Sequence, residues 1–253
     1  MKMTIKHAIT REPSKTFSNC LSTHPLHHSI DIKRAKEQHQ KYRIILKELG
    51  VEVINLAPER EYPDSCFVED TAIIHKDKAL ITRMAKTNRR GEEQRIAEIL
   101  QKYFSIINTK PPATLEGGDV IHLPDRLICG ITKRTNEKAI PQLQAWFNVP
   151  IDIIEDQTIM HLKSYVNYVG KDTIITTQQF KNHPKLIPYK KILVPEEEKY
   201  AANALAINDV ILVAANYPNT QARLKEEGFE IIPINLSEFQ KCDGAITCLS
   251  LIF

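Results

Sequence analysis

Hydrophobic and polar positions follow one order repeatedly along this chain. In TAIIHKDKALITR (71–83), two β-branched runs flank a Lys-Asp-Lys turn, which predicts a β-hairpin. The next segment, 89–104, carries apolar residues at helical spacing, and the run SIINT (105–109) predicts one further strand. The helical face comprises Ile96, Ile99, Leu100, Tyr103 and Phe104. The predicted unit is therefore strand, strand, helix, strand.

The same order recurs in the other parts of the chain. Hairpin patterns occupy 120–132, 165–177 and 204–215. Amphipathic helices are predicted over 33–49, 136–147 and 220–227. The first and last of these helices are followed by Gly50 and Gly228, the residue type that most often ends a helix.

Each unit is preceded by a short polar or charged motif, and these motifs are evenly spaced. With Glu69, Glu116, His161, Asn203 and Gly244 as markers, the steps are 47, 45, 42 and 41 residues. A near-constant period in this range is typical of propellers and other repeat architectures. If the units close into a ring, the marked residues meet near its axis and form a site. The motifs are PDSCFVED (63–70), LEGGD (115–119), MHLKS (160–164), AAN (201–203) and CDGAITC (242–248).

The two ends of the chain complete one unit. The closing run CDGAITCLSLIF predicts a strand that has no partner after it, while ITREPSKT (9–16) resembles ITRMAKTN (81–88) and ITKRTN (131–136) in the second strands of other units. Joining the ends in this way closes a ring and removes exposed sheet edges. No Gly/Ser-rich linker divides the chain. We therefore expect a single α/β domain over residues 1–253, built of five ββαβ-like units around a pseudo-fivefold axis.

Composition excludes several classes of function. The 253 residues are 42% apolar and 26% charged, and a net charge of +3 is too small to indicate binding to nucleic acid. The N-terminal segment has no signal-peptide pattern, and no run approaches the length of a membrane span. Five widely spaced cysteines without a CxxC pair argue against a disulfide framework or a zinc site, and predict reduced thiols in a cytoplasmic protein.

Cys248 and His161 are the candidate catalytic pair. Each is by default a packed core residue, since each stands among apolar neighbours in the sequence, and Cys248 is expected in the last strand. Together, a thiol and a remote imidazole are the minimum for nucleophilic catalysis by a thiolate, with the imidazole moving protons. The repeat gives a physical reason for them to meet.

Carboxylates dominate the first two motifs. Asp64, Glu69 and Asp70 lie on either side of a Phe-Val pair that would be buried in a strand, and Glu116 and Asp119 flank two glycines. An acidic pocket of this kind suits a cationic ligand, and a planar guanidinium matches carboxylates best because it engages them bidentately.

Arginines follow the second strands of two units. Arg89, Arg90 and Arg134 are expected at the mouth of the ring, where they could bind a substrate carboxylate. Acidic groups inside and arginines at the rim describe a site for an amino acid with a cationic side chain, which is arginine or a derivative of it.

With these motifs together, the chain resembles the dimethylarginine dimethylaminohydrolases of the guanidine-modifying superfamily. PDSCFVED, LEGGD, HLKS, KRTN and DGAITCLSL occur in the family's order from about Ile9 to Phe253. The resemblance implies the five-bladed α/β propeller called a pentein, which agrees with the period. It also implies conversion of dimethylarginine to citrulline and dimethylamine, without a metal or an organic cofactor, and a homodimer as the expected assembly.

The resemblance also implies a role for each residue. Cys248 would attack the guanidinium carbon to give a covalent thiouronium, His161 would protonate the leaving amine and then activate water, and Glu116 would orient His161. Asp64 and Asp70 would bind substrate nitrogens, supported by Glu69, while Arg89 and Arg134 would bind the α-carboxylate. Leu26, in a lid that reads THPLHHS here, and Phe67 complete the predicted substrate contacts.

Two other interpretations stay open. A citrulline hydrolase or an arginine deiminase would use the same thiol and imidazole on a different substrate, although the chain lacks the helical insertion common to arginine deiminases. A ribosome-binding translation factor has the same propeller without catalysis, but such a scaffold needs no Cys, His and carboxylates at equivalent repeat positions.

Overall fold

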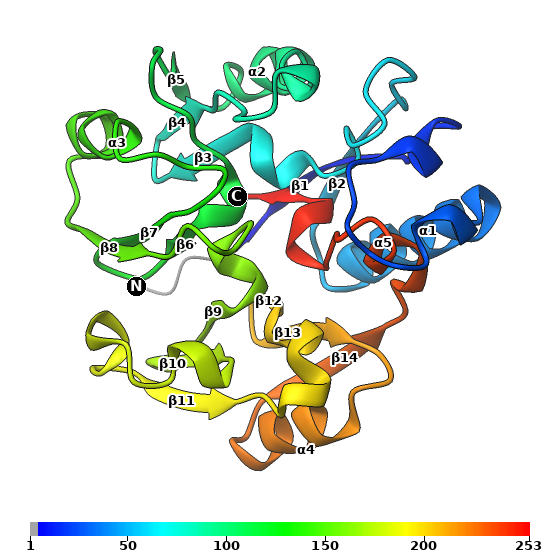
Figure 1. The fold of residues 1–253 in the computed structure, drawn as a ribbon, viewed down its shortest axis with the longest axis vertical. Helices are drawn as coiled ribbons and strands as arrows, with labels where there is room; N and C mark the ends of the chain where they lie inside the picture. The colour runs from blue at the N-terminus through cyan, green and yellow to red at the C-terminus, as the bar shows by residue number, and fades with distance from the viewer. Residues whose placement is uncertain (1–4) are drawn as a thin grey trace.

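Five small sheets surround a common centre, and the helices lie on the outside of the ring (Figure 1). The computed structural model describes residues 5–253. Over these residues fifteen strands form five three-stranded sheets. The predicted α/β propeller of five units is therefore confirmed.

The elements have the following bounds. The first sheet contains β1 (His7–Arg11), β2 (Glu52–Leu56) and β15 (Leu251–Ile252), and the second contains β3 (Ala72–His75), β4 (Lys78–Ile81) and β5 (Ser105–Asn108). The third contains β6 (Val120–His122), β7 (Leu127–Ile131) and β8 (Ile151–Glu155), and the fourth β9 (Val166–Gly170), β10 (Thr173–Thr176) and β11 (Lys190–Leu193). The fifth contains β12 (Leu205–Ile207), β13 (Val210–Ala214) and β14 (Glu230–Ile234). The helices are α1 (Ile32–Glu48), α2 (Gln94–Leu100), α3 (Ala139–Phe147), α4 (Pro218–Glu226) and α5 (Ser237–Gln240).

The ends of the chain share one sheet, as the sequence predicted. β1 lies between β15, with which it pairs antiparallel, and β2, with which it pairs parallel. In the other four sheets the middle strand likewise pairs antiparallel with the strand before it and parallel with the strand after the connection. The C-terminal residues are thereby held inside the ring, close to its centre (Figure 1).

The prediction of a ββαβ order is wrong for the sheet of β9, β10 and β11. The connection between β10 and β11 contains two single 3₁₀ turns, Gln178–Phe180 and Pro184–Leu186, where the other connections hold an α-helix. Two prolines, Pro184 and Pro188, fall inside this short segment. Because proline has no backbone N–H and clashes with the preceding turn, an α-helix cannot extend through it.

α1 shows how the outer helices are fixed. The Asp31 side chain accepts a hydrogen bond from the backbone N–H of Arg34 and caps the first turn, and Gly50 takes a positive φ just beyond the last turn. The helix buries Tyr42 and Leu46 in a cluster with Phe239 from the C-terminal segment. Full burial of side chains of this size contributes roughly 1.5–3 kcal/mol each. None of the described helices is long and apolar enough to cross a membrane.

The expectation of reduced, unpaired cysteines is wrong for two of the five. Cys20 and Cys242 form a disulfide across a sequence separation of 222 residues, with their Cα atoms 6.0 Å apart. Ring closure places the segment after β1 against the segment before β15, so residues from opposite ends of the chain become neighbours. Cys66, Cys129 and Cys248 are free thiols.

The five motifs share one local structure. Each forms a 3₁₀ turn that leads into the first strand of a sheet, and these turns lie next to one another around the centre. They are Val68–Thr71, Gly117–Asp119, Leu162–Ser164, Glu196–Ala202 and Thr247–Leu249. The strand expected around Cys248 is thus a turn, as is the segment that holds Glu69 and Asp70.

Candidate active site

His161 and two carboxylates form the centre of the site. The His161 Nε2 lies 2.8 Å from a Glu116 carboxylate oxygen and 3.6 Å from an oxygen of Asp70. Gly118 permits this approach because a Cβ on it would fall 2.8 Å from the His161 ring, and its N–H donates to Asp70. The predicted convergence of His161, Glu116 and Asp70 is what the structure shows.

The carboxylates favour the protonated form of His161. Burial alone would lower the pKa of this imidazole, but the negative charges of Asp70, Glu116 and Asp119, with the hydrogen bond to Glu116, raise the pKa to about 9. In the other direction, burial would raise the pKa of Asp70, but His161 and Arg89 lower it to about 2. At neutral pH the pair is therefore an imidazolium beside a carboxylate.

Asp119 positions the segment that carries His161. This carboxylate is completely buried and accepts hydrogen bonds from the Leu162 N–H at 2.9 Å and from the Thr132 hydroxyl at 2.8 Å. Burial raises the pKa of Asp119 to about 6, against the opposing effect of the charge on His161. The predicted EGGD motif thus supplies one residue that touches His161 and one that holds its backbone.

Both predicted arginines are buried, so their expected place at the rim is wrong. Arg89 donates to Asp70 through Nη1 at 2.9 Å and to Glu92 through Nε and Nη2. Arg134 places Nη1 3.7 Å from Glu116, and this atom is buried without a hydrogen-bond acceptor. Carboxylates inside the ring hold both cations there, because a buried guanidinium is tolerated only beside negative charge. Arg90, also considered for the rim, donates to the Met84 carbonyl.

Cys248 lies in the 3₁₀ turn before β15, not in a strand as predicted. The strand is short because the chain turns at Thr247–Leu249 to bring this motif to the centre of the ring. Burial raises the pKa of the Cys248 thiol far above its ordinary value, and the negative charges of Glu69 and Asp70 raise it further. The free protein therefore holds a neutral thiol at neutral pH.

A chain of hydrogen bonds fixes the Cys248 turn. Glu69 accepts the Thr247 hydroxyl at 2.7 Å and the Lys163 ammonium at 2.7 Å through its two oxygens. Asn203 accepts the Thr247 N–H at 3.0 Å and donates to the Thr247 hydroxyl and the Lys163 carbonyl. Sequence reasoning left Asn203 without a role, although its place in the period marked it. The network joins four of the five motifs next to the thiol.

The other predicted residues lie in different surroundings. The Asp64 carboxylate is buried and accepts the Leu21 N–H at 3.2 Å through both of its oxygens, so it also holds the loop after β1. The Phe67 ring lies against Gly244, where an added Cβ would fall 2.3 Å from it. Leu26 is 56% exposed, and its role in a lid stays a prediction.

A cavity of about 580 Å³ opens beside His161. Its walls include Met160 and Asn203, with Thr23 and His24 from the loop after β1 and Asp243 and Ala245 from the segment before Cys248. This volume lies in the range of small-molecule sites.

One group of donors here could in principle hold a metal ion. The ligand atoms of Asp70, Glu116 and His161 lie within 4.8 Å of one another. However, the Arg89 guanidinium already pairs with Asp70 and lies 3.9 Å from Glu116, so a cation added at this point would meet positive charge. The donor set therefore suits a substrate guanidinium, which spreads its charge, better than a divalent ion.

Comparison with known proteins agrees with this geometry. A model of the eukaryotic N,N-dimethylarginine dimethylhydrolase family matches residues 7–251. The N(G),N(G)-dimethylarginine dimethylaminohydrolase of Pseudomonas aeruginosa is 31% identical over 98% of this chain and 99% of its own length. A structure of DDAH from that organism, a Cys→Ser variant in complex with citrulline, superposes with a TM-score of 0.96 at 30% identity, covering 99% of this chain and 100% of that one. The bifunctional arginine dihydrolase/ornithine cyclodeaminase ArgZ of Synechocystis is 25% identical over 88% of this chain and 34% of its own length.

Proposed function

Because the chain belongs to the dimethylarginine dimethylaminohydrolase family of the pentein superfamily, we propose that it hydrolyses N-ω-methylated arginine to citrulline and dimethylamine. The observation that carries this proposal is the arrangement of His161 between Glu116 and Asp70, together with the packing of the Val68–Thr71 turn, which holds Asp70, against the turn that holds Cys248. Carboxylates bind a guanidinium, an imidazolium is an acid for the departing amine, and a thiol is the nucleophile.

The reaction proceeds in two halves. The Cys248 thiol loses its proton to solvent as the substrate cation binds, and its sulfur attacks the guanidinium carbon. The bond from that carbon to the dimethylated nitrogen breaks as His161 gives this nitrogen its proton. The product is dimethylamine and a thiouronium bonded to the enzyme. His161, now neutral, takes a proton from water, the resulting hydroxide attacks the same carbon, and the carbon–sulfur bond breaks to release citrulline.

The charges around Cys248 explain how its thiolate forms. Burial, and after it the carboxylates of Glu69 and Asp70, keep the pKa of the Cys248 thiol high in the free protein. A bound guanidinium cation neutralises this local negative charge and favours the thiolate, because an opposite charge within a few Å stabilises the ionised form. We therefore propose that substrate binding itself generates the nucleophile, which protects the thiol from oxidation when the site is empty.

Arg134 is the better placed of the two arginines to bind the substrate α-carboxylate. Its Nη1 has no acceptor, whereas three N–H groups of Arg89 are already used by Asp70 and Glu92. We propose that Arg134 makes the main contact and that Arg89 keeps Asp70 ionised and oriented.

The alternative reactions differ from the proposed one in the small molecule that they release and in the amino acid that they form. Arginine deimination releases ammonia, and hydrolysis of citrulline gives ornithine, whereas the proposed reaction releases dimethylamine. The citrulline bound to the Cys→Ser variant of the Pseudomonas aeruginosa DDAH is the amino-acid product of the proposed reaction, and it shows that this relative's site accepts that molecule.

The test is product analysis with four substrates. Purified protein is incubated separately with asymmetric dimethylarginine, monomethylarginine, arginine and citrulline, and dimethylamine, methylamine, ammonia, citrulline and ornithine are measured. We expect dimethylamine and citrulline in equal amounts, no turnover with Cys248→Ser, and full turnover with His183→Ala as a control outside the site. Ammonia from arginine without any dimethylamine would overturn the assignment of substrate, and full activity of Cys248→Ser would overturn the mechanism.

A further inference from the structure

The loop 20–31, here called the covering loop, forms part of the cavity wall and is fastened to the C-terminal segment 238–243. Ser22 donates to the Lys241 carbonyl at 2.8 Å, and the Thr23 N–H donates to the Asp243 carboxylate at 2.7 Å. The covering loop contributes Thr23 and His24 to the cavity, while the segment after Asp243 continues to Cys248. The contacts that join the covering loop to this segment therefore hold one wall of the cavity in place.

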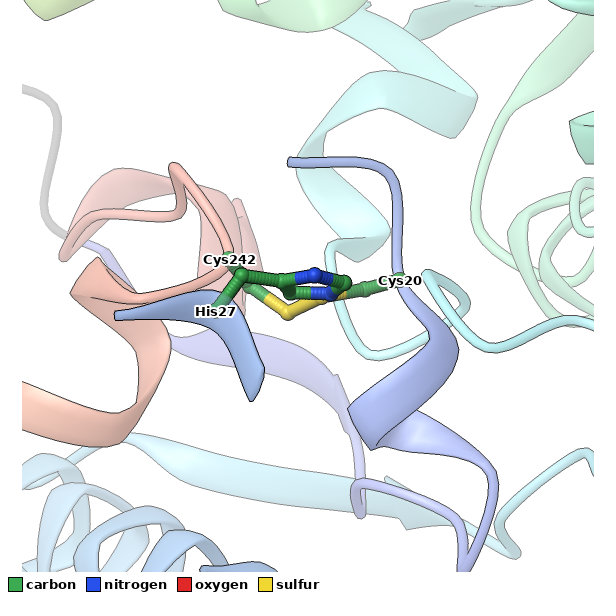
Figure 2. Close-up of side chains that lie close together, drawn as sticks. All are labelled: Cys20, His27 and Cys242. Carbon is green, nitrogen blue, oxygen red and sulfur yellow. A yellow bond between two sulfur atoms is a disulfide. The ribbon is translucent and has the colours of Figure 1, made fainter. Parts of the chain in front are cut away.

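Three metal-ligating side chains meet at this junction. The sulfur atoms of Cys20 and Cys242 and one imidazole nitrogen of His27 lie within 4.8 Å of one another. Figure 2 shows the His27 ring lying across the two sulfur atoms, between the covering loop and the C-terminal segment. The cysteines are only 3% and 2% exposed, so the group is closed off from solvent on the sulfur side.

His27 is not explained by the disulfide. Its Nε2 atom is buried and has no hydrogen-bond partner, an arrangement that costs about 1–3 kcal/mol for a neutral polar group. A disulfide neither accepts a strong hydrogen bond nor needs an imidazole beside it. Two thiolates and a neutral imidazole nitrogen are, by contrast, the donors that Zn²⁺ prefers, and a bound cation would satisfy Nε2.

We propose that Cys20, His27 and Cys242 bind one thiophilic divalent cation of the Zn²⁺ class when the protein is reduced, with a water molecule as the fourth ligand. The ion and two thiolates carry no net charge together, which removes the penalty for burying two anions. The site and the disulfide exclude each other, because the sulfur atoms ligate only as thiolates. Both forms fasten the covering loop to the same segment.

Conversion between the two forms is a balanced redox step. A trialkylphosphine supplies the two electrons: it takes oxygen from water to become the phosphine oxide, and the two protons of that water complete the Cys20 and Cys242 thiols. Each thiol then releases its proton as the cation binds. In this way the junction responds both to reductant and to the supply of metal.

The test uses Co²⁺ as a coloured substitute for Zn²⁺ in the Cys248→Ser protein, so that the active-site thiol cannot ligate. Protein reduced with tris(2-carboxyethyl)phosphine is titrated with Co²⁺ without oxygen, and the visible bands of tetrahedral thiolate-bound Co²⁺ are followed. We expect one equivalent to bind, to be displaced by Zn²⁺, and to be absent from the oxidised protein. Cys20→Ser and Cys242→Ser should abolish the thiolate bands. His27→Ala should weaken binding by at least the roughly 10–100-fold that changes around a metal site cost, and exposed His28→Ala should not.

A labelling experiment gives the same answer without a variant. In reduced wild-type protein, Zn²⁺ should protect Cys20 and Cys242 from iodoacetamide, as identified by peptide mass spectrometry, and leave the labelling of Cys66 unchanged. The proposal is overturned if the reduced protein binds no stoichiometric Co²⁺. It is equally overturned if binding survives loss of both cysteines, which would place the ion at Asp70, Glu116 and His161 instead. Neither readout depends on catalytic turnover.

Discussion

Replacing Glu116 with glutamine should lower the pKa of His161 without removing the contact between them. Glu116 is completely buried, and one of its oxygens lies 2.8 Å from the His161 Nε2, while the other accepts the Ala85 N–H. A glutamine side chain has the same shape, but only its carbonyl oxygen can accept, so it keeps the Ala85 N–H and turns its NH₂ group toward the His161 Nε2. That NH₂ group can donate to Nε2 only when the imidazole is neutral. The change therefore removes one negative charge and one acceptor of the imidazolium N–H, and both effects lower the pKa of His161.

The size of the effect follows from the position of the charges. The pKa of His161 lies at about 9, against an ordinary value of 6.5, so the surroundings favour the imidazolium by roughly 3 kcal/mol. A single opposite charge in contact accounts for roughly 1–3 pKa units. Arg134 and Arg89, which lie 3.7 and 3.9 Å from Glu116, would also lose a counter-charge and repel the imidazolium more strongly. We therefore expect a pKa of about 6–8 in Glu116→Gln.

The assay is an NMR titration of the His161 ring protons, carried out in the Cys248→Ser background. The raised pKa stabilises the folded protein fully below pH 6.5, and this contribution is lost as the pH rises toward 9; in Glu116→Gln the loss should begin and end at lower pH. Glu137→Gln is the matched control, because Glu137 is an exposed carboxylate paired with Lys138. An unchanged His161 pKa in Glu116→Gln would refute the account of the site electrostatics given above.

Asn203→Ala removes the amide that holds the Thr247 N–H and hydroxyl, so we expect kcat to fall by up to about 10²-fold with KM little changed, measured by citrulline release; an unchanged kcat would show that Asn203 does not position the thiol. His39 is completely buried, and burial lowers its pKa to about 3, so protonation in the unfolded state destabilises the protein as the pH falls below 6.5. His39→Leu should therefore be more stable than the parent by about 2 kcal/mol at pH 5 relative to pH 8 in urea unfolding; equal pH dependence of the two proteins would contradict this. Gly244→Ala should destabilise by about 1–3 kcal/mol, because the new methyl group displaces the Phe67 ring, and thermal unfolding at one pH measures it; a melting temperature equal to that of the parent would mean that the ring moves freely.

The even spacing of the motifs predicted most of the fold, because a repeated unit that cannot bury its own apolar face has to pack against copies of itself. The spacing did not predict that the connection 177–190 contains two 3₁₀ turns in place of an α-helix. Two prolines in this connection account for the difference. The pattern of apolar positions in that segment is compatible with either structure. A local steric constraint decided between them.

The disulfide was missed for a different reason. Rules for cysteine pairs rest on short spacings along the chain, whereas Cys20 and Cys242 are brought together by ring closure over 222 residues. The prediction that the first and last residues share a sheet already contained the signal, because it places the segments next to β1 and β15 side by side. Spacing in the sequence is a poor guide wherever a fold joins its own ends.

Arg89 and Arg134 show what residue type alone cannot decide. Both were expected at the mouth of the ring because each follows the second strand of a unit. Their true position follows from the carboxylates: Asp70, Glu92 and Glu116 are buried, and buried negative charge requires cations beside it. Each charged residue is visible in the sequence. Which carboxylate pairs with which arginine follows only from the structure, where the turns of several units meet.

Asn203 is a residue whose role is indicated by its position in the repeat and not by its residue type. Its side chain carries no charge and performs no acid–base chemistry, so a search for reactive residue types passes over it, yet the repeat placed it level with Glu116 and His161. In the structure its amide joins Thr247, beside Cys248, to the backbone of Lys163, two residues after His161. In a ring of repeats the groups of one site come from different units. Hydrogen bonds between units, such as those of Asn203, are therefore needed to fix the positions of these groups relative to one another. The equivalent position in a repeat therefore identifies residues that hold a site together as well as those that react in it.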